Sequence, residues 1–146
     1  MKLALWQTVG FPGDTVANLG ALETTARAAA AAGAALLLCP ECWLCGYNIG
    51  TAVTALAEHR DGGSSQVVAG IARRNNIAIA YGYAEREVAG GEVYNAVQVI
   101  GPDGERLGHY RKTHLFGADE RAAYRPGDRF EPTPTELTGG PSSTGF

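Results

Sequence analysis

Apolar and polar residues follow two different periods along this chain, which predicts helices placed between strands. Four short apolar runs bounded by glycine, proline or asparagine predict strands, at residues 2–8, 35–39, 77–83 and 93–100. Between them, residues 15–32 and 64–75 repeat apolar side chains every three or four positions, as amphipathic helices do. The order strand, helix, strand, helix, strand predicts a layered α/β fold with crossover connections.

Capping residues and periodicity define the helices more closely. Asp14 or Thr15 can cap the first helix, and Gly33 is its expected stop. The predicted apolar face of this helix comprises Val16, Leu19, Leu22, Ala26 and Ala29. Ser64 or Ser65 can cap the second helix, which is expected to end at residues 75–76. Its expected inner residues are Val67, Val68, Ile71 and Ala72. A shorter, weaker helix is predicted at residues 51–59.

After the third strand the connections change from crossovers to hairpins. A turn at residues 89–91 leads into the fourth strand, and Gly-Pro-Asp-Gly at 101–104 returns residues 105–111 as an antiparallel fifth strand. Residues 131–146 are rich in proline, glycine, serine and threonine. They predict an irregular tail, disordered or out of frame, beyond a domain that spans residues 1–130.

Composition and charge narrow the class of protein. A chain of 146 residues with 45% hydrophobic residues can bury the core of one domain. The formal net charge of -3 provides no basic footprint for nucleic acid or for a membrane surface. The longest apolar stretch, residues 28–40, is too short to span a bilayer, and Met1-Lys2 does not begin a signal peptide. We therefore expect a cytoplasmic protein without nucleic-acid or membrane partners.

Three cysteines, Cys39, Cys42 and Cys45, raise the question of a metal or redox site. Their C-x2-C-x2-C spacing could indicate zinc or an iron–sulfur cluster, but a fourth cysteine is missing, so buried inert thiols are favoured. Cys42 next to Glu41 could be a nucleophile, although neighbouring side chains of an extended segment point to opposite faces. An odd number of cysteines indicates a reducing compartment. No glycine-rich phosphate loop follows a strand, and we expect neither metal nor cofactor.

Two charged residues stand where apolar runs end. Glu41 follows residues 35–40, and Lys112 follows residues 105–111. The carboxyl ends of strands are where α/β sheets open pockets, so a desolvated Glu41 could be a general base and a fixed Lys112 ammonium could stabilise an oxyanion. Taken singly, each residue is better explained as a solvated surface charge. Their joint placement at strand ends favours a catalytic role only modestly.

Two longer motifs resemble the nitrilase superfamily of carbon–nitrogen hydrolases. They are LLLCPECWLCGYNIG at residues 36–50 and GPDGERLGHYRKTHLFG at 101–117, with Tyr-Asn-Ala-Val-Gln at 94–98 between them. The resemblance extends from Lys2 to about Phe130. Within the superfamily the chain is most similar to the amidase branch that acts on ω-amino amides, such as 5-aminopentanamidase. The resemblance implies that residues 1–130 are the N-terminal portion of an α-β-β-α sandwich.

The resemblance also implies a Glu-Lys-Cys triad. Glu41 matches the general base, and Lys112 matches the lysine that stabilises the oxyanion. Glu120 matches a second carboxylate that positions the substrate, with Asp119 as the alternative, and Tyr47 is expected near the pocket mouth. The implied reaction is cofactor-free acyl transfer on a small-molecule amide: a cysteine thiolate attacks the amide carbon, ammonia leaves, and water hydrolyses the thioester.

The nucleophile is the missing member of this triad. In the superfamily it ends an apolar strand soon after the segment corresponding to residues 135–137, where this chain has Gly-Pro-Ser-Ser-Thr-Gly-Phe at 140–146. None of the three cysteines matches that position. We therefore expect an N-terminal half, inactive by itself, whose full-length form is a homodimer or larger homo-oligomer. The alternatives are a non-catalytic binding or oligomerisation module, or a member of the nitrilase or N-carbamoyl amine amidase branch.

Overall fold

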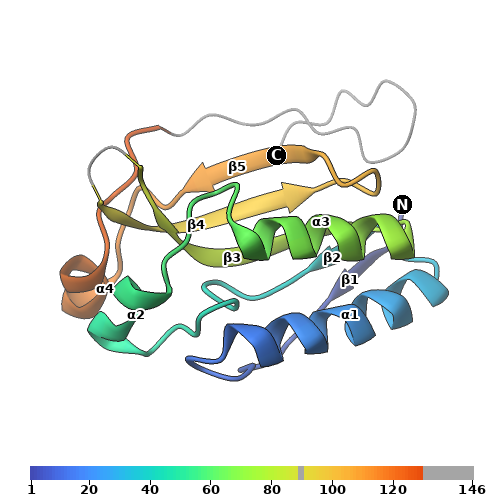
Figure 1. Cartoon of the computed structure of the whole chain (residues 1–146), viewed down its shortest axis with the longest axis horizontal. Helices are drawn as coiled ribbons and strands as arrows, with labels where there is room; N and C mark the ends of the chain where they lie inside the picture. The colour runs from blue at the N-terminus through green and yellow to red at the C-terminus, as the bar shows by residue number, and fades with distance from the viewer. Residues whose placement is uncertain (89–90, 130–146) are drawn as a thin grey trace.

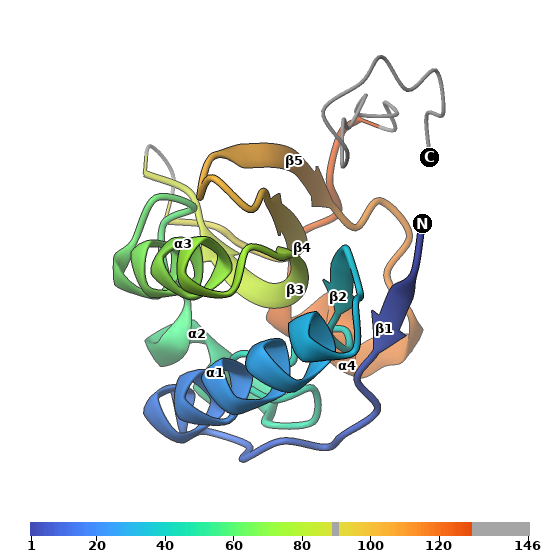
Figure 2. The ribbon, with the colours of Figure 1, turned by 90° about the vertical axis from the view of Figure 1, so that its right-hand side faces the viewer.

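A five-stranded sheet organises the chain, with two long helices packed on one of its faces (Figures 1 and 2). The computed structural model describes residues 1–88 and 91–129. Residues 89–90 of the turn predicted at 89–91, and the predicted tail at 131–146, lie outside the described residues. The expected α/β class is confirmed.

The strands follow the sequence in their spatial order across the sheet. Their bounds are β1 Leu3–Leu5, β2 Leu36–Leu38, β3 Ala78–Arg86, β4 Val93–Ile100 and β5 Arg106–Arg111. The pairs β1–β2 and β2–β3 are parallel, whereas β3–β4 and β4–β5 are antiparallel. The predicted change from crossover to hairpin connections is therefore confirmed.

The helix α1 (Thr15–Ala31) begins as the sequence predicts. The Asp14 side chain caps it by accepting a hydrogen bond from the Ala17 N–H at 2.9 Å. Val16, predicted on the apolar face, is 81% exposed, so this prediction was wrong. The inward position of the first turn belongs instead to Asn18, which is fully buried and binds main-chain groups of Phe11 and Leu44.

Two predictions for the helix α3 (Gly63–Asn75) were wrong, namely its cap and one of its inner residues. Its N-cap is Gly62, and Ser64 lies inside the helix, where its hydroxyl and N–H donate hydrogen bonds to the Glu58 carboxylate. Val67 is 45% exposed, because Val68 takes the inward position at that point of the helix. The predicted end is confirmed, since Asn76 adopts the left-handed conformation that closes a helix.

Three short helices complete the described chain. The weak helix predicted at residues 51–59 is a 3-10 turn, Gly50–Ala52, followed by one turn of α2, Val53–Leu56. The helix α4 (Gly117–Ala123) was not predicted from the sequence. Within residues 1–88 and 91–129, no helix is long and apolar enough to cross a membrane.

The main core fills the space between the two long helices and the sheet. Buried side chains of α1 and α3, such as Leu22 and Ile71, pack there with Ile79 and Tyr81 of β3. On the opposite face of the sheet, small residues of β3 such as Ala78 and Ala80 form a thinner cluster. Alternate residues of β3 therefore face two different environments, which is the reason that residues 78–84 of the strand carry no charged side chain.

Candidate active site

Glu41 lies in a tight turn at the carboxyl end of β2. The turn packs directly on β3, where the Leu44 N–H donates a hydrogen bond to the Gly82 carbonyl at 3.0 Å. A Cβ atom at Gly82 would lie 2.5 Å from the Cys42 nitrogen and 2.8 Å from the Pro40 oxygen. Position 82 therefore requires glycine if the turn that carries Glu41 is to approach this closely.

Lys112 follows β5 and continues its pairing with β4. Its N–H donates a hydrogen bond to the Asn95 carbonyl at 2.8 Å. The Lys112 ammonium donates hydrogen bonds to Glu41 Oε1 at 2.7 Å and to Glu120 Oε1 at 2.9 Å. Desolvation alone would lower the pKa of Lys112, but the two carboxylates outweigh it and raise that pKa. The lysine is therefore a fixed cation.

Glu120 projects from α4 and is 6% exposed. Besides Lys112, it accepts hydrogen bonds from the Tyr47 hydroxyl at 2.6 Å and from the Phe116 N–H at 2.6 Å. Burial would raise the pKa of Glu120, yet these donors lower it, while the carboxylate raises the pKa of Tyr47 to about 12. Glu120, and not the exposed Asp119, contacts Lys112.

Asn95 completes the cluster, although no role was predicted for it from the sequence. Its side-chain amide donates a hydrogen bond to Glu41 Oε1 at 2.7 Å. The signal available in the sequence was an asparagine within an apolar predicted strand. The structure buries this side chain, and a buried amide requires a polar partner. Glu41, Asn95 and Lys112 line a cleft of about 250 Å³. The other lining residues are Cys39, Pro40, Gly82, Ala96, Val97 and Tyr110.

The three cysteines occupy different environments. Cys42 has a φ of 48° in the turn, so the premise of an extended segment at residues 41–42 was wrong. Its thiol is fully buried within hydrogen-bond distance of the Tyr124 hydroxyl, at 3.4 Å, and burial raises its pKa to about 12. Cys45 is also buried, whereas Cys39 lines the cleft. In the described part of the chain, no three His, Cys, Asp or Glu residues are arranged to hold a metal ion.

The geometry brings together all four residues that the resemblance singles out. Glu41, Lys112 and Glu120 are joined through one ammonium, and Tyr47 binds the far carboxylate. The Glu41 side chain is 46% exposed, so the predicted desolvation of this carboxylate was wrong. Such a cluster can hold a positive charge next to a carboxylate that solvent reaches. The arrangement fits acid–base chemistry with oxyanion stabilisation.

Comparisons with known proteins show the family to which the chain belongs. The carbon-nitrogen hydrolase family model matches residues 2–144. The "Hydrolase in pqqF 5'region" of Pseudomonas protegens is 48% identical over 129 residues, which cover 88% of this chain and 44% of that protein. The crystal structure of an amidase from Nesterenkonia sp. is 29% identical, with a TM-score of 0.83, over 94% of this chain and 52% of that one.

A second amidase structure is similar to this chain. It is a mutant of the amidase from Nesterenkonia sp. AN1 "showing the result of Michael addition of acrylamide at the active site cysteine". It is 29% identical to this chain, with a TM-score of 0.75, over 96% of this chain and 54% of that one. The present chain thus spans about half the length of the relatives that it matches.

Proposed function

Because the chain belongs to the carbon-nitrogen hydrolase family, we propose that Glu41, Lys112 and Glu120 form the acid–base and oxyanion-binding part of an amidase site. The observation that carries this proposal is the Lys112 ammonium held between two carboxylates, 2.7 Å from Glu41 and 2.9 Å from Glu120. The reaction is hydrolysis of an aliphatic amide to a carboxylate and ammonia.

In the proposed reaction, Glu41 takes the proton from a cysteine thiol, and the thiolate forms a bond to the amide carbon. Lys112 stabilises the oxyanion, for which its raised pKa keeps it protonated. Glu41 then gives its proton to the leaving nitrogen as the carbon–nitrogen bond breaks. Water hydrolyses the thioester with Glu41 again acting as the base, which restores the thiol.

The nucleophile is proposed to be a cysteine other than the three in this chain. Burial raises the pKa of both Cys39 and Cys42 to about 12, which leaves their thiols protonated near neutral pH. Cys45 is 1% exposed, and burial raises its pKa too. The active-site cysteine named for the Nesterenkonia amidase supports a cysteine as the nucleophile. The 146 residues alone are therefore proposed to be inactive.

The proposed substrate class is an ω-amino amide. A cavity of about 690 Å³ adjoins the cluster through Tyr47 and Glu120. Its described lining includes the exposed carboxylate of Asp119 and no lysine or arginine, whereas the charge of Glu120 is already paired with Lys112. This electrostatic environment favours a substrate with a cationic group remote from its amide.

The full-length form is proposed to be a cytoplasmic homo-oligomer. The edge strand β1 leaves Leu3 46% exposed and Leu5 68% exposed, and apolar surface of this kind favours association. The cysteines within the described residues form no disulfide, which fits a reducing compartment. Sedimentation of the full-length protein would test the oligomeric state, and a monomer at micromolar concentration would contradict it.

A chimera tests the proposed function directly. The region of the Pseudomonas protegens hydrolase that matches this chain would be replaced by the corresponding residues of this chain, since the two are 48% identical there. We expect the chimera to release ammonia from 5-aminopentanamide, faster than from pentanamide, and the 146-residue chain to release none. A folded chimera that acts on the matching nitrile or N-carbamoyl amine, but on neither amide, would contradict the proposal.

A further inference from the structure

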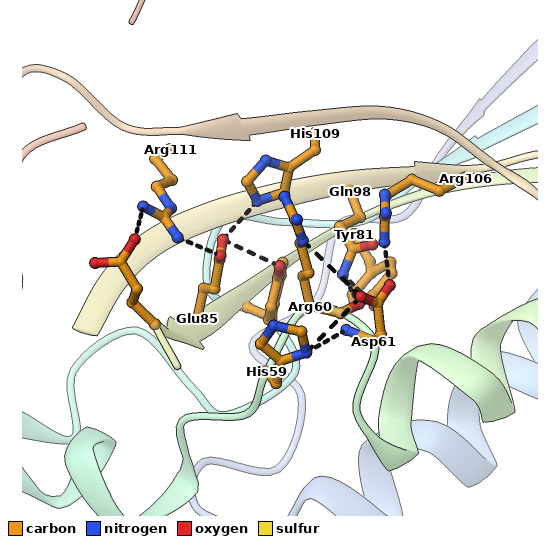
Figure 3. Close-up of polar contacts among 11 residues, drawn as sticks. His59, Arg60, Asp61, Tyr81, Glu85, Gln98, Arg106, His109 and Arg111 are labelled. Carbon is orange, nitrogen blue, oxygen red and sulfur yellow. Dashed lines mark hydrogen bonds and ion pairs between the residues drawn. The ribbon is translucent and has the colours of Figure 1, made fainter. Parts of the chain in front are cut away.

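A buried carboxylate outside the cluster, Glu85 of β3, lies at the centre of a polar network (Figure 3). Its side chain is 1% exposed. In the strand register Glu85 pairs with Tyr94, one residue before Asn95, so Glu85 and Asn95 face opposite sides of the sheet. Glu85 therefore lies behind the sheet as seen from the cleft that contains Glu41 and Lys112.

Arg111 and His109 of β5 both contact this carboxylate. Arg111 Nη2 donates a hydrogen bond to Glu85 Oε1 at 2.7 Å, and His109 Nε2 lies 2.5 Å from Oε2. Figure 3 shows both side chains pointing from β5 toward Glu85. Burial would raise the pKa of Glu85, but hydrogen bonds to His109 and Arg111 outweigh it and lower that pKa to about 2. The carboxylate stays ionised and holds β5 across the intervening strand.

Arg111, which Glu85 binds, directly precedes Lys112 in the chain. Arg111 is also held by a weaker contact, with Glu87 Oε1 at 3.2 Å, and its guanidinium lies 4.0 Å from the ring centroid of Tyr94. At the next residue, the Gly127 N–H donates a hydrogen bond to the Lys112 carbonyl at 2.9 Å. The main chain of residues 111–112 is thus held from both sides of the strand, and the direction of the Lys112 side chain depends on that main chain.

We propose that Glu85 is a positioning residue, which acts through Arg111 to hold the Lys112 ammonium between Glu41 and Glu120. The importance of this role rests on the proposed function of Lys112. The positioning itself does not, because it concerns only where the ammonium lies. Without the Glu85 carboxylate, Arg111 still has its ion pair with Glu87, whose side chain is 38% exposed. This remaining ion pair draws the end of β5 toward solvent. The two short bonds of Lys112 cannot both survive such a shift.

The chain offers a clean probe, because Lys2 and Lys112 are its two lysines. Nitrogen-15 labelling of lysine gives two side-chain ammonium signals, which a Lys2→Arg variant assigns. We expect a protected ammonium signal for Lys112 that broadens or is lost in Glu85→Gln. The rate at which acetic anhydride acylates Lys112, relative to its rate at Lys2 in the same molecule, should rise about fivefold or more. Loss of a typical interaction free energy between two contacting residues would produce a rise of this size.

Matched variants separate positioning from folding. Glu87→Gln removes the weaker, exposed partner of the same arginine and should leave both readouts of Lys112 unchanged. Glu85→Asp keeps the charge but shortens its reach, so we expect partial rescue, and it carries the test if Glu85→Gln does not fold. A Glu85 variant with native circular dichroism and a wild-type Lys112 signal and acylation ratio would overturn the proposal. Neither readout requires amide turnover, so an inactive chimera would refute the proposed function and leave this result standing.

Discussion

Replacing Gly82 with alanine tests how closely the turn that carries Glu41 approaches β3. The added Cβ would lie 2.5 Å from the Cys42 nitrogen, 2.8 Å from the Pro40 oxygen and 3.0 Å from the Glu41 carbonyl carbon. All three atoms belong to main chain, which cannot rotate away as a flexible side chain would. The whole turn must move, and we expect overpacking of this kind to destabilise the chain by about 1–3 kcal/mol.

Gly20 is the matched control for this substitution. It lies within α1, and a Cβ atom there meets nothing within 4 Å. Gly20→Ala should therefore stabilise the chain by about 0.5–1 kcal/mol, because alanine restricts the unfolded chain and favours a helix. The same glycine-to-alanine change is thus expected to act with opposite sign at the two positions.

Urea unfolding followed by circular dichroism measures both variants. With a urea slope of about 2 kcal/mol per molar, the transition midpoints of the two variants should differ by about 1–2 M, with Gly82→Ala the lower. A midpoint for Gly82→Ala at or above that of the parent chain would refute the close packing of the turn on β3. It would also remove the reason given for the fixed position of Glu41.

Three further predictions concern buried groups. Glu85 has a pKa of about 2 in the folded chain, against an ordinary value of 4.5, so its contribution is fully present above about pH 4.5 and is lost as the pH falls toward 2. Urea midpoints should decline over this range, and less steeply in Glu85→Gln. The Cys42 thiol should react with iodoacetamide at pH 8 several hundredfold more slowly in the folded chain than in urea, because burial raises its pKa to about 12; equal rates would contradict this. Asn18→Ala should lower the free energy of unfolding by about 2–4 kcal/mol, since it leaves polar main-chain groups of Phe11 and Leu44 without partners. A decrease no larger than that caused by a substitution at an exposed site would contradict this prediction.

Much of the fold could be predicted from the sequence, because strands and helices leave periodic patterns. Asp14 as a cap and the hairpin at residues 101–104 were correct for local chemical reasons. Val16 and Val67 were wrong, although each fits the period of its helix. Periodicity defines a face of a helix, but only tertiary packing decides which residues of that face another element covers.

The site was harder to predict, because its members are far apart in the chain. Glu41 and Lys112 are 71 residues apart, and each alone is typical of a surface charge. The resemblance supplied their pairing, together with Glu120 and Tyr47. Glu85 gave no such signal, since a glutamate near the end of a strand indicates neither burial nor the partners that the folded sheet provides.

The most direct test of the account is the rate of ammonia release by the chimera and by its Glu41→Gln variant. We predict that Glu41→Gln lowers kcat by about 10²–10⁴-fold, the usual contribution of general acid–base catalysis, while Glu87→Gln has little effect. Lys112→Met should cause a loss of about 10²–10³-fold, of the size expected for an oxyanion-stabilising group. A folded Glu41→Gln chimera that releases ammonia at the parent rate would contradict the central claim.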